Sequence, residues 1–471
     1  MPLRTFESPL ARATPRDLFA WHARPGAFER LCPPWQTIRI DQPAPVEDGS
    51  VAELRMKKGP LWIPWTALHR DVEPGRAFVD VQTAGPFSRW VHRHEFLASD
   101  DGALLRDRID FRLPGGALGQ ALAGRAIDRD LRTTFAYRHE TTARDLARHA
   151  DFASRPSQTI ALSGAGGLVG SALAPFLTTG GHRVLPLVRP NAEPTAPPSW
   201  ATGEAIAWRP DRGLDAPESI GHRLDAVVHL AGESIASGRW TAARKERLRS
   251  SRVDATRHLV RSLARLDPPP RTLVCASAIG YYGSRGDTPL DESSARGDGF
   301  LAELSEAWEA AAAEAATAGI RLVVLRFGII LSPAGGALAK MLPAFRLGVG
   351  GRLGSGRQIM SWVSIDDAIG AVHRAVLDDR LQGPLNVVAP NPVTNEEFTK
   401  TLARALRRPA ILPLPAGAAR LAFGQMADEM LLASARVEPR RLTDMGFRFD
   451  DPELAGTLDR LLGRTEIAWA N

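Results

Sequence analysis

The stretch from Thr159 to Gly170 has the residue types and spacing of a phosphate-binding turn. Its first residues form a short apolar run typical of a buried strand, and glycines follow at Gly164, Gly167 and Gly170 before an apolar helical pattern begins. In such a strand–loop–helix unit the first glycine permits a tight turn, the second lets backbone N–H groups approach a pyrophosphate, and the third lets the helix pack close to the strand. The sequence therefore predicts a dinucleotide site, because the helix N-terminus adds unpaired donors and a partial positive charge.

The backbone groups that would hold the pyrophosphate come from the loop and from the first helical turn. We expect contacts from Gly164, Gly166, Gly167, Leu168, Val169 and Gly170. A second contribution is predicted after a buried strand over residues 225–230, where the small residues Ala231 and Gly232 let a cofactor lie across the carboxyl edge of the sheet. The alternative is an ordinary glycine-rich turn between a strand and a helix.

The residue at the end of the next predicted strand, over 183–188, distinguishes the two nicotinamide dinucleotides. It is Arg189, and it lies about 20 residues beyond the glycines, where an acidic residue would bind the ribose of NAD and an arginine the 2′-phosphate of NADP. Because Arg189 is basic and no acid stands beside it, NADP is preferred over NAD. The alternative is a solvated arginine at a strand end.

Further segments follow the pattern of the extended short-chain dehydrogenases/reductases. They are 229–232, 277–283, 326–328 and 362–367. Within that superfamily, 277–283 together with 308–311 resembles the atypical branch of epimerase family proteins similar to bacterial YfcH. The C-terminal part resembles the small domain of unknown function, DUF1731, that accompanies this branch. The resemblance covers residues 157 to about 463, and it implies an NAD(P)-binding Rossmann domain with an epimerase- or oxidoreductase-like activity.

The acid/base pair of working members of that superfamily is absent from this chain. They use a tyrosine with a lysine four residues later, because a tyrosine of pKa about 10 is a poor base at neutral pH without a neighbouring cation. No tyrosine of this chain has such a lysine, and the corresponding helix positions hold Phe300 and Leu304. The tyrosines are Tyr137, Tyr281 and Tyr282.

Ser277 and Tyr281 are the remaining candidates for catalysis. Ser277 is placed to hydrogen-bond a carbonyl or hydroxyl oxygen beside a nicotinamide. Tyr281 precedes Arg285 by four residues, so that cation could activate it, although a structural or substrate-contacting role is the alternative for a residue in a turn. Glu233 is a further candidate for a polar contact, and a solvated charge is its simpler interpretation.

The N-terminal region has a different pattern, with strands separated by turn signals. A short helix capped by Thr14 precedes them, and a long helical pattern from Leu118 to Leu146 closes the region. This order of elements resembles the START/Bet v 1-like (SRPBCC) superfamily, in its polyketide cyclase/dehydrase-type branch, which implies a helix-grip fold around an apolar cavity. The strands are predicted at 37–40, 51–57, 62–72, 77–83, 90–98 and 104–113.

Aromatic and histidine residues of this region have two interpretations each. The aromatic residues either line the implied cavity or fill the core, and core filling is favoured; they are Trp62, Trp65, Phe78, Phe87, Trp90 and Phe96. His69, His92 and His94 lie among the strands without supporting carboxylate or cysteine spacing, so we interpret them as core or surface histidines and predict no metal site.

The predicted fold is an α/β Rossmann domain with a doubly wound parallel sheet and a small C-terminal α+β substrate part, preceded by an α+β helix-grip domain. The predicted boundaries are 1–153, 157–385 and 386–471. The formal charge of +6 is spread without a basic run, so no nucleic-acid partner is expected. Two distant cysteines imply no disulfide framework. Neither a signal peptide nor a membrane span is indicated, and we expect a cytoplasmic protein.

Three functions remain open on these residues. The first is an NADP-binding epimerase or reductase acting on a small molecule, with the N-terminal domain presenting or shielding an apolar substrate. The second is a non-catalytic NADP-binding sensor, which the missing tyrosine–lysine pair favours. A third possibility, that the N-terminal domain is the main functional part and binds an apolar ligand, predicts a co-purified ligand.

Overall fold

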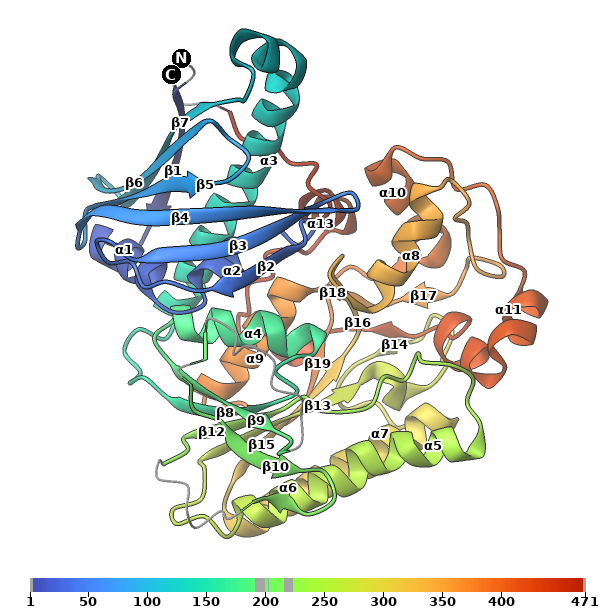
Figure 1. Ribbon diagram of the computed structural model, residues 1–471. Helices are drawn as coiled ribbons and strands as arrows, with labels where there is room; N and C mark the ends of the chain where they lie inside the picture. Colours follow the sequence, from blue (N-terminus) through green and yellow to red (C-terminus); the bar gives the residue numbers. More distant parts are fainter. Residues whose placement is uncertain (1–2, 191–199, 202, 216–222, 469–471) are drawn as a thin grey trace.

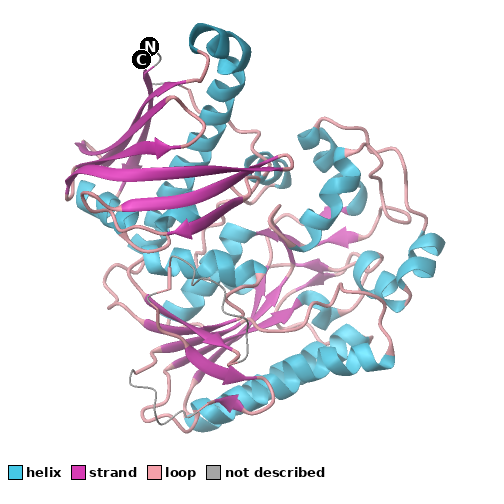
Figure 2. Ribbon diagram, viewed as in Figure 1, coloured by secondary structure: helices cyan, strands magenta, loops and turns pink. Residues whose placement is uncertain are grey.

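The computed structural model describes residues 3–190, 200–201, 203–215 and 223–468, and it contains two large sheets (Figures 1 and 2). The first sheet is antiparallel and N-terminal, and the second is mostly parallel and central in the chain. The sequence also predicts a surface loop over the proline-rich segment 190–199, which lies outside the described residues except for Pro190.

The N-terminal sheet has seven strands in the order β1-β7-β6-β5-β4-β3-β2. The long helix α3 (Gly116–Ala150) packs against this sheet and continues toward the parallel sheet (Figure 1). The strands are β1 (Leu3–Ala11), β2 (Ile38–Gln42), β3 (Val51–Lys58), β4 (Leu61–Glu73), β5 (Ala77–Ala84), β6 (Arg89–Ser99) and β7 (Gly102–Arg112). The short helices α1 (Pro15–Ala23) and α2 (Ala27–Leu31) follow β1.

Most N-terminal elements agree with the predicted ranges, and one strand was missed. Thr14 caps α1 as predicted, because its hydroxyl accepts from the backbone N–H of Asp17 while the Asp17 carboxylate accepts from the N–H of Thr14. The missed strand is β1, which contains Pro9. Proline is tolerated there because β1 is an edge strand that pairs only with β7.

The predicted aromatic residues of this region are mostly core residues. Phe78, Trp90 and Phe96 are buried, and Trp65 and Phe87 are partly buried against the same apolar cluster as Trp90. Trp62 departs from both interpretations, because its ring is exposed beneath the cationic groups of Arg39 and Lys57.

The second sheet has eight strands in the order β11-β10-β9-β8-β12-β13-β15-β19, of which β8 to β10, β12, β13, β15 and β19 are parallel. This is the doubly wound Rossmann order, whose direction of winding reverses between β8 and β12. The strands are β8 (Thr159–Ser163), β9 (Arg183–Val188), β10 (Ile206–Arg209), β11 (Gly213–Leu214), β12 (Ala226–His229), β13 (Thr272–Ala278), β15 (Arg321–Phe327) and β19 (Gly383–Val387). The helices of this part are α4 (Leu168–Thr179), α5 (Ala242–Arg249), α6 (Ala255–Leu263), α7 (Phe300–Ala313) and α9 (Ile365–Leu377).

The remaining elements build a smaller part beside the carboxyl edge of the parallel sheet. It contains short strand pairs and helices rather than another large sheet (Figure 1). The helices are α8 (Gly336–Arg346), α10 (Asn395–Leu406), α11 (Ala416–Phe423), α12 (Arg440–Asp444) and α13 (Leu454–Leu461). The strands are β14 (Pro289–Leu290), β16 (Ile329–Leu331), β17 (Ile359–Met360), β18 (Trp362–Ser364), β20 (Val393–Thr394) and β21 (Arg436–Val437).

A buried ion network joins the N-terminal region to the parallel sheet and to the C-terminal part. Arg30 of α2 donates to both oxygens of Asp145 on α3, at 2.8 and 2.7 Å, and to Asp366 of α9 at 3.0 Å. Arg460 of α13 donates to the other oxygen of Asp366 at 2.7 Å. Burial alone would raise the pKa of Asp366, but Arg460 and Arg30 hold that pKa well below its ordinary value.

A second set of charges extends this network. Arg148 of α3 donates to Asp367 at 2.6 Å and to Asp450 at 2.7 Å, while Arg144 donates to Asp451 at 3.0 Å. Removing one member of a buried ion pair is costly because the partner keeps an uncompensated charge. The N-terminal region is therefore fixed against the rest of the chain by charges rather than attached through a free linker.

Candidate functional site

The loop between β8 and α4 lies where the winding of the parallel sheet reverses. Gly164 has a φ of +73°, and a Cβ there would lie 2.9 Å from the carbonyl carbon of Leu230 at the end of β12. At Gly170 a Cβ would collide with the carbonyl oxygen of Gly164, so α4 can pack this close to the loop only without a side chain. These two glycines therefore serve the turn and the helix packing, as predicted for the first and third positions.

The glycines between them have a different environment. Gly166 is exposed, has no neighbour within 4 Å of an added Cβ, and needs no left-handed backbone. Gly167 is the N-cap of α4 and supplies no side-chain cap. The first turn of α4, which includes Leu168 and Val169, therefore presents donors at an open surface, the arrangement that binds phosphate groups at helix N-termini.

The end of β12 faces the glycine loop across the switch point. Leu230 donates its N–H to Ser163 Oγ at 3.1 Å, and His229 Nδ1 lies 2.7 Å from the same hydroxyl. Burial lowers the pKa of His229 to about 4, so its imidazole is neutral and holds the Ser163 hydroxyl through a hydrogen bond. Ala231 and Gly232 follow at the open edge, where an added Cβ on Gly232 would approach the guanidinium of Arg252 at 3.2 Å.

Arg189 is exposed directly after β9, next to the strand that leads into the glycine loop. The side chain of Glu233 is 37% exposed, and its carboxylate pairs with Arg244. Arg252 donates to the backbone oxygen of Glu233 at 2.9 Å, so this segment is held to the helices that follow β12.

The carboxyl ends of the next three strands carry a continuous hydrogen-bonded network. Ser277, Arg326 and Asn386 are neighbours in register on β13, β15 and β19. Ser277 Oγ donates to Glu309 Oε1 of α7 at 2.7 Å. Arg326 donates to both oxygens of Glu309, at 2.9 and 2.7 Å, a bidentate pair that fixes the orientation of both side chains.

Two adjacent tyrosines complete this network in different ways. Tyr282 is fully buried, accepts from Arg326 at 2.9 Å and donates to Asn386 Oδ1 at 2.7 Å, and burial raises its pKa to about 12. Tyr281 is half-buried, with its ring stacked 3.5 Å from the guanidinium carbon of Arg326. The cation beside Tyr281 is therefore Arg326, whereas Arg285 is exposed in the following turn.

The predicted catalytic candidates, Ser277 and Tyr281, belong to this one network. The residues at the missing tyrosine and lysine positions, Phe300 and Leu304, are buried in the core. Glu309 and Tyr282 lie within the family-like segments 308–311 and 277–283, but sequence reasoning assigned them no role. Asn386 was not singled out, because only the register of β19 with β15 places it beside Arg326.

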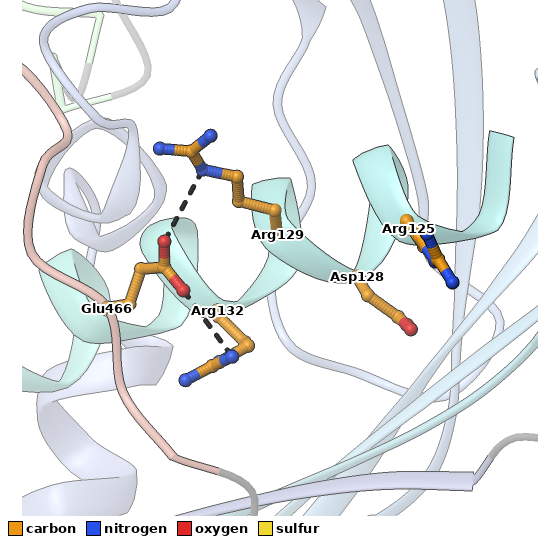
Figure 3. Close-up of a pocket in the computed structure, with 5 residues that line it drawn as sticks. All are labelled: Arg125, Asp128, Arg129, Arg132 and Glu466. Carbon is orange, nitrogen blue, oxygen red and sulfur yellow. Dashed lines mark ion pairs between the residues drawn. The ribbon is translucent and has the colours of Figure 1, made fainter.

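A separate surface hollow of about 360 Å³ lies far along α3 from this network. Glu466 of the C-terminal tail pairs there with Arg129 and Arg132, at 3.3 and 3.4 Å, while Arg125 and Asp128 line the other end (Figure 3). Because Arg129 and Arg132 pair with Glu466 of the same chain, these ion pairs fix the C-terminal tail to α3.

Comparisons with known proteins connect this geometry to a family. Residues 160–388 match the model described as "NAD dependent epimerase/dehydratase family", and residues 414–461 match the domain of unknown function DUF1731. An epimerase family protein of Mycobacterium bovis is 45% identical over 290 residues, which cover 62% of this chain and 93% of that protein.

Two solved structures are also similar. One, described as a nucleoside-diphosphate sugar epimerase from Corynebacterium glutamicum, is 31% identical, covers 99% of this chain and 91% of its own, and has a TM-score of 0.80. The other is the human epimerase family protein SDR39U1 with NADPH, which is 33% identical, covers 65% of this chain and 100% of its own, and has a TM-score of 0.58.

Proposed function

The chain belongs to the epimerase family of NAD-dependent epimerases and dehydratases, and on that basis we propose that it binds NADP(H) and acts as a reductase- or epimerase-like enzyme on a small molecule. The glycine loop carries this proposal. At Gly166 the fold itself leaves room for a side chain, because an added Cβ would meet nothing within 4 Å, and this residue lies just before the open N-terminus of α4. An approaching pyrophosphate accounts for a glycine at this position. At Gly167 an added Cβ would lie 3.1 Å from the backbone oxygen of Gly164, so the turn itself also favours glycine there.

The choice of NADP over NAD rests on Arg189 and on a relative. Arg189 is exposed at the strand end where a 2′-phosphate would bind, and its guanidinium suits bidentate recognition of that group. The related human protein has a structure with NADPH. When bound, the nicotinamide supplies hydride transfer, and the chain's own residues bind and orient the reactants.

For the chemical step we propose Ser277 and Tyr281 as the groups that contact the substrate. The Ser277 hydroxyl donates to Glu309, so its oxygen lone pairs remain to accept a hydrogen bond from a substrate hydroxyl. Tyr281 carries a phenol whose ring lies against the Arg326 guanidinium, which makes it the candidate proton donor or acceptor. The rigid Glu309–Arg326 pair positions both residues.

A non-catalytic NADP sensor is the second candidate, and one observation favours it. The family's acid/base positions are filled by buried apolar side chains, Phe300 and Leu304, and the hydroxyl protons of Ser277 and Tyr282 are already donated inside the network. In a sensor of this kind the bound cofactor stabilises a binding surface without turnover.

For the N-terminal region we propose a helix-grip domain of the START/Bet v 1-like kind, with an apolar small molecule as the ligand class. The seven-stranded antiparallel sheet and the helix α3 packed against it support this proposal.

The experiment combines affinity with turnover on the full chain. NADPH and NADH are titrated by fluorescence against wild type and Arg189→Ala, and absorbance at 340 nm is then followed with aldehydes, ketones and quinones. The NADP proposal expects Arg189→Ala to weaken NADPH binding about tenfold or more while leaving NADH binding unchanged. Turnover that Tyr281→Phe abolishes supports the enzyme. Tight binding without turnover on any substrate supports the sensor.

A further inference from the structure

A row of histidines and aspartates crosses the inner face of the N-terminal sheet. Side chains two residues apart share one face of a strand, so His92 and His94 of β6 point the same way. Asp80 of β5 pairs in register with His92, and Asp107 of β7 pairs with His94. His69 of β4 pairs in register with Asp80. Sequence spacing gave no carboxylate partner for these histidines, but the neighbouring strands supply two.

The distances in this cluster divide it into an inner and an outer set. Asp80, His92 and His94 each offer one ligand atom, and these atoms all lie within 4.8 Å of one another. Around them, His69 Nδ1 lies 2.6 Å from Asp80, and Asp107 lies 2.8 Å from His92 Nε2.

His94 is the member whose polar atoms are least well satisfied by hydrogen bonds. Its Nε2 lies 3.4 Å from Asp80 Oδ2, which is longer than a charge-assisted hydrogen bond of about 2.7–2.9 Å. Its Nδ1 lies 2.7 Å from Asp107 Oδ1 but lacks the alignment of a hydrogen bond. Two atoms held about 2.0–2.1 Å from a tetrahedral zinc lie about 3.3 Å apart, which matches the His94–Asp80 separation.

We propose that Asp80, His92 and His94 form a binding site for a divalent transition-metal ion, with zinc as the best match to two imidazoles and one carboxylate. Three protein ligands leave a fourth position for water or a ligand oxygen, as in zinc sites that are not purely structural. This metal site does not depend on the function proposed for the nucleotide site.

The outer residues have the roles expected around a metal site. Metal-ligating histidines usually donate their second N–H to a carboxylate, and ligating carboxylates are themselves hydrogen-bonded. Asp107 is the carboxylate beside both His92 and His94, and it also contacts His139 of α3 at 2.6 Å. His69 holds Asp80 in the same way.

The charge of the cluster and its access to solvent also fit a bound metal cation. Asp80 and Asp107 bring two carboxylates into a cluster where Asp107 is 2% exposed, and buried carboxylates are found hydrogen-bonded, paired with a cation or bound to a metal. The side chain of Asp80 is 24% exposed, so an ion can enter from that side. The rings of Phe78, Trp90 and Phe135 pack against the imidazoles of His94 and His92.

The test uses the full chain without a polyhistidine tag, stripped with EDTA. Zn²⁺ is titrated by calorimetry, and Co²⁺ is added to look for the visible absorption of a tetrahedral site. The ligand variants are Asp80→Asn and His92→Gln. The outer variant is His69→Gln. The control is His258→Gln on α6, whose imidazole bonds to a backbone oxygen in the nucleotide part. Circular dichroism and urea unfolding establish that each variant is folded.

We expect one Zn²⁺ per chain in wild type and in His258→Gln, a loss of at least about 100-fold in affinity for the two ligand variants, and about 10- to 100-fold for His69→Gln. Absence of stoichiometric binding in wild type overturns the site and leaves the cluster as a hydrogen-bonded network with a proton on His94. Equal binding by wild type and the folded ligand variants also overturns it, because the metal then binds elsewhere.

Discussion

Gly166 allows a test that separates cofactor binding from folding. An added Cβ at this position meets nothing within 4 Å, and the backbone needs no left-handed conformation. Gly166→Ala should therefore leave the free energy of unfolding unchanged or raise it by about 0.4–1 kcal/mol, since alanine restricts the unfolded chain. In the cofactor site that we propose, the same methyl group would stand where the pyrophosphate approaches.

The expected loss of affinity follows from the hydrogen bonds that the methyl group prevents. One backbone hydrogen bond to a charged group contributes about 1.5–3 kcal/mol. Its loss weakens NADPH binding by about 10- to 150-fold, at about 1.4 kcal/mol per factor of ten. Gly170→Ala should differ in kind, because its Cβ collides with the backbone of Gly164 and the variant is destabilised.

The assay is an NADPH fluorescence titration paired with urea unfolding of the apo protein. The matched control is Gly417→Ala in α11, which is exposed, has equal free space and lies outside the site. It should keep wild-type affinity. Wild-type NADPH affinity in Gly166→Ala would refute the assignment of this loop as the phosphate site, and a folding defect would refute our description of the free space around Gly166.

Three further predictions concern the networks around the site. Asp366→Asn leaves two buried guanidinium groups short of a charge partner, so urea unfolding should show a loss of about 3–5 kcal/mol, whereas the exposed Asp459→Asn should change little. Glu309→Gln disrupts the bidentate pair with Arg326 and should lower the melting temperature. The glycine loop should still bind NADPH in this variant, and full loss of NADPH binding would contradict the view that the two sites are independent. Burial lowers the pKa of His229 to about 4 in the folded chain, against about 6.5 in the unfolded chain, so its neutral form stabilises the fold above pH 6.5. About 3 kcal/mol of the free energy of unfolding is therefore lost as the pH falls from 6.5 to 4. His229→Gln should flatten the dependence of this free energy on pH in that window, and an unchanged slope would contradict the prediction.

Local signals explain how much of the fold could be predicted from sequence. The strands β2 to β7 were predicted because turn residues separate them and their side chains alternate, and Thr14 and Pro15 marked the start of α1. The strand β1 was missed because its pairing with β7 joins segments about 100 residues apart and Pro9 weakens its strand pattern. The glycine loop was found because its geometry depends on residues that are adjacent in sequence.

The polar networks could not be predicted because they depend on register between separate strands. Ser277, Arg326 and Asn386 meet only because β13, β15 and β19 align at their carboxyl ends. Likewise, Asp80 reaches the histidines of β6 only through cross-strand pairing. The residue types suggested that these side chains could have a role, but their spacing along the chain did not indicate which residues they contact.

Two simpler expectations from composition concern the membrane and the cysteines. No helix among the described residues is long and apolar enough to cross a membrane. Both cysteines are free, with Cys275 buried and Cys32 partly buried.

The most direct test of the central claim is calorimetric titration of the full wild-type chain with NADPH and, separately, with NADH. We predict one NADPH site per chain and an affinity for NADPH at least about tenfold higher than for NADH, because Arg189 is exposed at the end of β9, where we propose that it binds the 2′-phosphate. Binding of neither nucleotide would contradict the assignment of the glycine loop, and equal or tighter binding of NADH would contradict the role of Arg189.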